Sequence, residues 1–253
     1  LAKDIHDDVG SGLARVAGKP PLWRSISFVL GVASLYIVLQ THIDYYAQHM
    51  FFVHRWAHFV LHHAGAFLIA MGASGPVLYA GMPDFLKPVA DSRPVRGVMN
   101  VLQHPAIAPV LFVGLLYFWL IPSIHTVVML DRNLYDVMNW TMAINGIMFW
   151  SLVLDPRAKP PARLSPLIRG LMILLIELPQ MVLGAILSLS MTDYYPVYKI
   201  CGRALDFSAL SDMHYGGLII WLPGTLTSFA AMIVVLVNMR LNEEKEEREK
   251  ASL

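Results

Sequence analysis

The feature that most constrains this chain is a series of apolar stretches, each about 20 residues long and nearly free of charge. A helix of that length crosses the roughly 30 Å hydrocarbon layer of a bilayer. Hydrophobic residues make up 56% of the 253 residues and charged residues 15%, against about 25% charged in average soluble domains. This composition excludes a soluble enzyme, a nucleic-acid-binding protein and a disordered chain.

The apolar stretches are continuous, which is typical of transmembrane helices, and they do not alternate as barrel strands do. We therefore predict an all-α fold, a polytopic transmembrane helix bundle with about six spans. The predicted helices cover residues 23–40, 46–72, 101–120, 134–154, 166–191 and 212–239. The predicted domains are a polar N-terminal segment (1–22), a transmembrane domain (23–240) and a charged tail (241–253), which we interpret as a solvated helical extension.

Basic residues are distributed unevenly between the predicted loops. Of the 19 Lys and Arg residues, 15 fall on one side: the N-terminal segment, the second-to-third loop, the region from the fourth-to-fifth loop into the fifth span, and the tail. The opposite side has Arg132, Lys199 and Arg203, and Arg55 lies within the second span. Because cytoplasmic loops are enriched in Lys and Arg, we predict that both termini are cytoplasmic.

The second predicted helix is unusually rich in histidine. It contains five histidines and Arg55. Polar and ionisable groups within a membrane cost free energy and mark functional positions. His54, His58 and His62 follow an i, i+4, i+8 spacing, so they share one face of a helix. Neutral imidazole is a good ligand for copper, zinc, iron and nickel, so this face is a candidate metal site.

Other metal-binding side chains are predicted near the outward end of this face. A set of histidine, methionine and carboxylate groups suits copper, and methionine favours Cu(I). Hydrogen bonding to a neighbouring helix is the alternative role for any single histidine, and we favour it for His63 and His104. The candidate copper ligands are His49, His54, His58, His62, His125, Asp212 and His214.

Four other features allow simple interpretations. The single cysteine, Cys201, excludes an internal disulfide and a Cys-rich zinc site. Glu177, just before Pro179, is either a proton-linked group or a partner for the free backbone groups of a kinked helix. Tyr194, Tyr195 and Tyr198 suggest an interfacial aromatic belt. Residues 4–13 resemble the phospho-acceptor box of sensor histidine kinases over only ten residues, which we interpret as a chance match.

Several local patterns occur together and in order along the chain. The most specific is the stretch from Ser208 to Pro223. The patterns are His54-xxx-His58, His104-Pro105, Phe118-Trp119 with Pro122, Gly146-Ile-Met-Phe-Trp150, Pro179 with Gly184-Ala-Ile-Leu, Tyr195-Pro-Val-Tyr198 and Ser208-Ala-Leu-Ser-Asp212-Met-His-Tyr-Gly-Gly217-Leu-Ile-Ile-Trp221-Leu-Pro223. Over residues 45–240 the chain resembles the CtaG family, the assembly factors of caa3-type cytochrome c oxidase in bacteria.

The resemblance implies a non-enzymatic protein of the bacterial inner membrane that handles copper for a haem-copper oxidase. It implies the oxidase, or another membrane complex, as partner within the lipid bilayer, and no nucleic acid. His54, His58, His104, Asp212 and His214 occupy family-like positions. The chain also departs from the family, which usually has seven spans. It has Leu120, Tyr135 and Asn139 where the family commonly has histidine.

Other functions stay open on the sequence alone. An accessory subunit without metal chemistry is favoured by the missing family histidines. A haem-b electron carrier would need a facing histidine at matching depth on another span. A membrane di-iron oxygenase would need a further histidine box downstream of His62 and His63. We expect no catalytic residues.

Overall fold

The computed structural model describes residues 21–72, 79, 81–160 and 162–252. The described residues form helices and no strands, so the predicted all-α class is confirmed. The polar segment 1–22 lies almost wholly outside these residues, as does the stretch at 4–13. In chain order the helices are α2 (Leu22–Gln40), α3 (His42–His49), α4 (Phe51–Phe59), η1 (Val60–Ala64), α5 (Gly65–Gly72), α7 (Lys87–Ala90), α8 (Arg93–Leu102), α9 (Ile107–Leu120), α10 (Pro122–Leu130), α11 (Arg132–Val153), α12 (Pro166–Leu189), α13 (Val197–Ile200) and α14 (Ala209–Ala251).

Three helices in the described part of the chain are long and apolar enough to cross a membrane, namely α2, α12 and α14. A fourth span results if α8 and α9 are counted together, although they meet at a bend of 76°. The chain is therefore a membrane protein with three to four spans by length and composition, fewer than the six predicted. The predicted second helix is interrupted in the structure, so it is not counted as a helix long enough to span the membrane.

The break in the second helix lies at Met50, whose backbone is extended with φ −139° and ψ 125°. The prediction of one helix over 46–72 is therefore wrong, and α3 and α4 are separate. The backbone N–H groups of Phe51 and Phe52 at the start of α4 donate to the carboxylate of Asp212, at 3.1 and 2.8 Å. This cap from a distant helix satisfies donors that a helix start leaves free.

The other predicted helices agree with the structure apart from their ends. The third begins at Ile107, not at residue 101, because the chain turns at His104 and Pro105 between α8 and α9. The sixth begins at Ala209 after a Ser208 cap and continues to Ala251. The charged tail is therefore a helical extension, as predicted. The third-to-fourth loop contains the short helix α10, which the sequence analysis did not predict.

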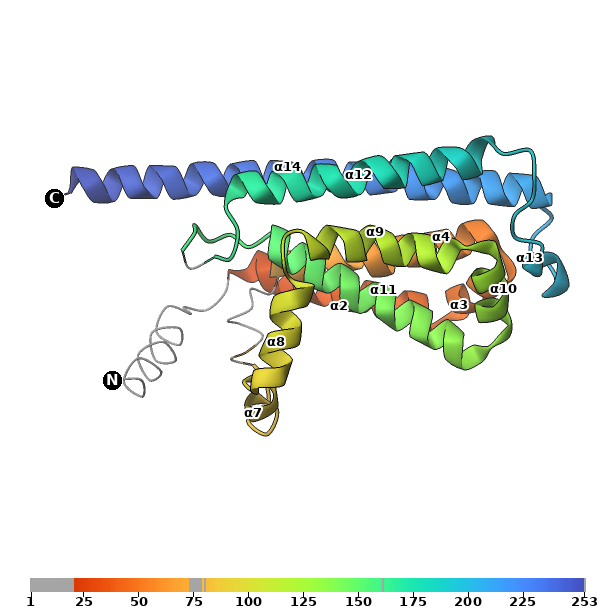
Figure 1. Cartoon of the computed structure of the whole chain (residues 1–253), viewed down its shortest axis with the longest axis horizontal. Helices are drawn as coiled ribbons and strands as arrows, with labels where there is room; N and C mark the ends of the chain where they lie inside the picture. The colour runs from red at the N-terminus through yellow and green to blue at the C-terminus, as the bar shows by residue number, and fades with distance from the viewer. Residues whose placement is uncertain (1–20, 73–78, 80, 161, 253) are drawn as a thin grey trace.

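Helices α12 and α14 lie side by side along the length of the molecule (Figure 1). Their contact depends on glycine, because a Cβ built on Gly217 would lie 2.6 Å from the Ser188 nitrogen and 2.8 Å from the Gly184 carbonyl oxygen. Small residues of this kind let membrane helices approach closely. The described part of α14 extends past the rest of the bundle at its C-terminal end (Figure 1).

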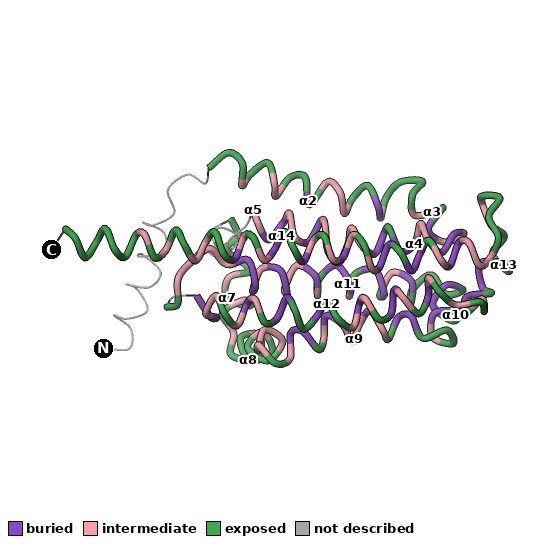
Figure 2. Tube along the Cα trace, turned by 90° about the horizontal axis from the view of Figure 1, so that it is seen from above, coloured by how far each residue is buried: buried purple, intermediate pink, exposed green. Residues whose placement is uncertain are grey.

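The segment from α4 through η1 to α5 lies in the interior of the bundle. Figure 2 shows much of α4 and α11 as buried, whereas α2 is exposed along most of its length. On α4 and η1 the buried side chains include polar ones, and the polar groups of the bundle therefore meet inside an apolar surround. These buried residues are His54, Arg55, His58, His62 and His63.

Candidate functional site

His54 and His58, one turn apart on α4, point their ring nitrogens at each other. Their Nε2 atoms are 3.0 Å apart, and both side chains are buried. Asn139 on α11 completes the contact, with its Oδ1 atom 3.1 Å from His58 Nε2. The i, i+4 spacing therefore does place the two imidazoles together, as the sequence predicted, and a cation placed at this point would meet two nitrogen atoms.

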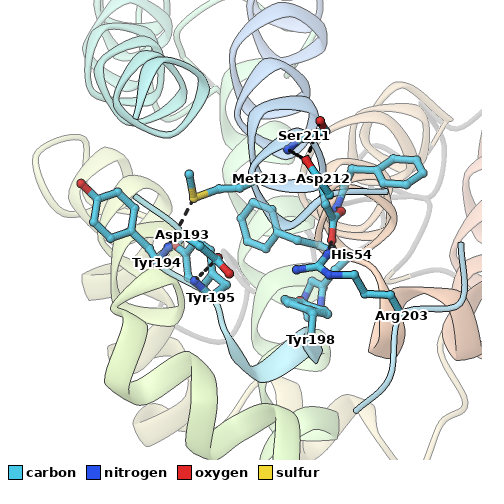
Figure 3. A network of polar contacts seen from close by, with 12 residues as sticks. His54, Asp193, Tyr194, Tyr195, Tyr198, Arg203, Ser211, Asp212 and Met213 are labelled. Atoms are coloured by element: carbon cyan, nitrogen blue, oxygen red, sulfur yellow. Dashed lines mark hydrogen bonds and ion pairs between the residues drawn. The ribbon is translucent and has the colours of Figure 1, made fainter. Parts of the chain in front are cut away.

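A hydrogen-bonded chain continues from His54 to the C-terminal end of α9. His54 Nδ1 is 3.1 Å from the hydroxyl oxygen of Tyr198, and this oxygen is 3.0 Å from Nε2 of His125. His125 Nδ1 is 2.9 Å from the carbonyl oxygen of Trp119. The prediction that His125 lies near the histidine face is therefore confirmed, and Tyr198 is the residue that connects the two (Figure 3 shows it beside His54).

The tautomers in this chain follow from the Trp119 carbonyl, which only accepts hydrogen bonds. His125 must donate from Nδ1, so as a neutral ring it accepts at Nε2 from the Tyr198 hydroxyl. The Tyr198 oxygen then accepts from His54 Nδ1, and the lone pair on His54 Nε2 faces Nε2 of His58. His54 is thus held in the form in which Nε2 can bind a metal.

His62 and His63 both reach the interior because the chain there forms a π-helical turn, η1. The N–H of Gly65 donates to the carbonyl of Val60, five residues back, and such turns occur frequently at functional sites. His62 Nε2 is 3.1 Å from Asn145 Oδ1, and His63 Nε2 is 2.8 Å from Gln180 Oε1. His63 bonds a neighbouring helix, as predicted. His62 is not in hydrogen-bonding contact with the His54–His58 pair.

Arg55 lies among these histidines without a hydrogen bond. Its three nitrogen atoms are buried and have no partner among the described residues, and neither do the Nδ1 atoms of His58, His62 and His63. The guanidinium carbon is 5.1 Å from the ring centre of Phe51. Arg55 therefore places a positive charge in the centre of the bundle.

Asp212 is buried, but it does not join the histidines. Its carboxylate accepts from the α4 backbone and forms an ion pair with Arg203, which Figure 3 shows extending toward it. The residue therefore fixes α4 against α14 and holds the loop that follows α13. These contacts engage both oxygen atoms of Asp212, so its role in this structure is to position α4.

The remaining candidates lie apart from the pair. His49 bonds the carbonyl of Tyr45 within α3 at 2.7 Å, and His214 bonds the carbonyl of Ser190 at 2.7 Å. His104 is exposed and accepts from the backbone of Ala106. Within the described ranges no group of three or more His, Cys, Asp and Glu side chains is arranged to hold a metal ion. The structure thus brings His54, His58 and His125 together, and it leaves His49, His62, Asp212 and His214 in separate surroundings.

Two sequence interpretations need correction or completion. Tyr195 and Tyr198 are buried, at 2% and 0% exposure, so they do not belong to an interfacial belt. Glu177 accepts from the Thr225 hydroxyl on α14, and its Oε2 atom is buried without a partner among the described residues. Neither proposed role of Glu177 is therefore decided by its contacts.

The thiol of Cys201 stays protonated at neutral pH in the absence of a metal. It lies just after α13, outside the membrane-length helices, and partial burial raises the pKa of its thiol. The thiolate is the form that binds metal.

Comparison with known proteins gives one family and two relatives. A family model described as cytochrome c oxidase caa3 assembly factor (Caa3_CtaG) matches residues 9–241. Two proteins described as uncharacterized, from Mycobacterium bovis (strain ATCC BAA-935 / AF2122/97) and Mycobacterium tuberculosis (strain CDC 1551 / Oshkosh), are each 25% identical over 244 residues, which cover 89% of this chain. The chain spans 35% of the length of each relative. No solved structure gives a significant match.

Proposed function

Since this chain belongs to the Caa3_CtaG family of cytochrome c oxidase caa3 assembly factors, we propose that it handles copper for a haem-copper oxidase in the bacterial inner membrane. The copper is cargo in this proposal, and the chain performs no chemical conversion. His54 and His58 are the residues that receive the ion. The oxidase, or a subunit of it, is the partner to which the ion passes.

The observation that carries the proposal is the buried contact between the two Nε2 atoms at 3.0 Å. His54 already presents a lone pair there, because Tyr198 and His125 fix its tautomer. His58 becomes a second metal ligand when its hydrogen moves from Nε2 to Nδ1, because Nε2 then carries a lone pair. Its Nδ1 atom has no other partner among the described residues. Imidazole nitrogen suits copper. A protein that passes copper onward needs a site that can also release it, which two ligands allow more readily than four.

The surroundings of the pair support a copper site that can release its ion. Asn139 Oδ1 lies 3.1 Å from His58 Nε2. The sulfur of Met129 lies 3.9 Å from the Tyr198 hydroxyl, which contacts His54 at Nδ1 and not at Nε2. Amide oxygen is a weak ligand for copper. Asn139 stands where the family commonly has histidine, so we propose that this member binds copper less firmly than a four-ligand site would.

The proposed topology has six membrane crossings with cytoplasmic termini. The crossings are α2, the α4–η1–α5 segment, α9, α11, α12 and α14. In Figure 1 the short helices α3, α10 and α13 lie at one end of the bundle, whereas α7, α8 and the end of α14 lie toward the other. The second end carries most of the basic residues, which supports its assignment to the cytoplasm.

An accessory subunit without metal chemistry is the second candidate. It is favoured by the absence, within the described ranges, of a site with three or more ligands. In that case His54, His58 and His125 serve only to hydrogen-bond α4 to α11, α13 and the end of α9.

Oxidase maturation distinguishes the two candidates. Cells that lack this protein are complemented with the wild type, with His54→Ala plus His58→Ala, or with His49→Ala as a control on the same predicted span. We expect the double variant to reach the membrane but to leave the oxidase deficient in copper. We expect His49→Ala to restore the copper content of the oxidase. Normal oxidase copper in cells carrying the double variant would favour the accessory role.

A further inference from the structure

Arg55 differs from Arg169, a second buried arginine in the described part of the chain. Arg169 donates to the backbone carbonyl oxygens of Leu164, Asp155 and Arg157, so each of its nitrogen atoms has an acceptor. Arg55 is 1% exposed, and all three of its nitrogen atoms lack an acceptor among the described residues. Native proteins rarely leave a buried charge in this state, because the free-energy cost is large.

A small internal cavity adjoins Arg55. Its volume is about 20 Å³, and its polar wall consists of Arg55, His58, His62, His63 and Gln180. The rest of the wall is apolar, from side chains of α4, α9, α11 and α14. A space of this size holds a single particle about as large as a water molecule.

The described wall of the cavity contains no counter-ion for Arg55. No carboxylate lies on it, and no ion pair joins Arg55 to any described residue. Imidazole rings carry no negative charge. The Nε2 atoms of His58, His62 and His63 already contact amide oxygens of Asn139, Asn145 and Gln180. The contact with the Phe51 ring is weaker than the cost of burying an isolated cation.

We infer that this cavity binds one small inorganic anion, of the size of chloride, as the counter-ion of Arg55. The guanidinium on the cavity wall carries five N–H donors, and the apolar part of the wall leaves an anion there few other polar neighbours than the histidines and Gln180. The inference does not depend on copper handling at His54 and His58. The small volume favours a monatomic halide such as chloride or bromide over the larger sulfate and gluconate ions.

The test compares the thermal stability of the full chain in detergent across potassium salts at equal ionic strength. A ligand that binds only the folded state raises the melting temperature in a saturable way. We expect chloride and bromide to raise it by about 3 °C relative to gluconate, and sulfate to behave like gluconate once general salt effects are subtracted. Equal melting temperatures in all four salts would overturn the inference.

Two variants decide whether the effect comes from Arg55. Arg55→Met removes the charge and should abolish the difference between chloride and gluconate, whereas Arg132→Met, an exposed position on α11, should retain it. Retention of the full halide effect in Arg55→Met would contradict the inference. If Arg55→Met does not fold, the binding of radiolabelled chloride to the wild type is measured instead, with bromide or sulfate added as competitor. Displacement by bromide but not by sulfate supports the site, and no saturable binding overturns it.

Discussion

At the scale of single residues, the buried histidines are of two kinds, which differ in how many ring nitrogens have a hydrogen-bond partner. His54 and His125 use both ring nitrogens, and the Trp119 carbonyl fixes their tautomers through Tyr198. His58, His62 and His63 use only Nε2, and their Nδ1 atoms have no partner among the described residues. The first kind has a fixed orientation and tautomer. The second kind keeps one ring nitrogen without a hydrogen bond to a described residue.

The sequence predicts part of this arrangement. The i, i+4 spacing of His54 and His58 depends only on local helix geometry, so it could be recognised without a structure. Tyr198 and Asn139 lie 144 residues from His54 and 81 residues from His58, respectively. No local spacing connects residues so far apart. Tyrosine is also common at membrane interfaces, so the sequence suggests an interfacial position for Tyr198. For that reason the sequence could not place either one beside the pair.

Asp212 gives a prediction at this scale. Asp212→Asn leaves Arg203 without a counter-charge and weakens the cap on Phe51 and Phe52. We expect the free energy of unfolding to fall by about 1–3 kcal/mol. Asp193→Asn is the matched control, because Asp193 only accepts from the backbone of Tyr195 in a partly exposed turn. Melting temperatures in detergent measure both, and an equal loss in the two variants would contradict the proposed role of Asp212.

At the scale of helices, the apolar stretches predict where helices exist but not where they break. Helices α2, α11 and α12 follow their apolar stretches closely. The extended residue Met50 and the π turn η1 lie inside an apolar stretch that continues without a turn signal. Both places are in contact with other helices: Asp212 caps the start of α4, and Gly146 of α11 lies close to the backbone of His62.

The contact between α12 and α14 gives a prediction at this scale. A methyl group at residue 217 would overlap the Ser188 backbone and the Gly184 carbonyl, so Gly217→Ala should separate the two helices. We expect a loss of about 1–3 kcal/mol in the free energy of unfolding. Gly114→Ala on α9 has no atom within 4 Å of the added carbon and gains helix propensity, so it should be neutral or stabilising. Similar melting temperatures for the two variants would argue against this contact.

At the scale of the whole molecule, the composition already determines the class. A chain with 56% hydrophobic residues in long runs forms a membrane helix bundle, and the match of the family model over residues 9–241 confirms the resemblance read from the motifs. The number of membrane crossings does not follow from the composition alone. The polar residues of α11 and the break at Met50 keep two segments from qualifying as spans by length and composition.

Chemical labelling tests the proposed topology. With Cys201 changed to serine, single cysteines are introduced at Asp206, between α13 and α14, and at Lys245, in the tail; both are exposed. A maleimide that cannot cross membranes should label residue 206 in intact spheroplasts. It should label residue 245 only after the membrane is permeabilised. The opposite pattern would invert the topology, and labelling of both positions from outside would contradict a membrane crossing by α14.

Copper binding at the His54–His58 contact is the claim on which the proposed function depends. The most direct measurement loads the purified chain with Cu(I) in detergent, removes free metal and determines the copper content by mass spectrometry, with a visible spectrum of the same sample. We predict close to one copper per chain without a Soret band, its loss in His54→Ala plus His58→Ala, and its retention in His49→Ala. Unchanged copper content in the double variant, or no copper in the wild type, would contradict the account.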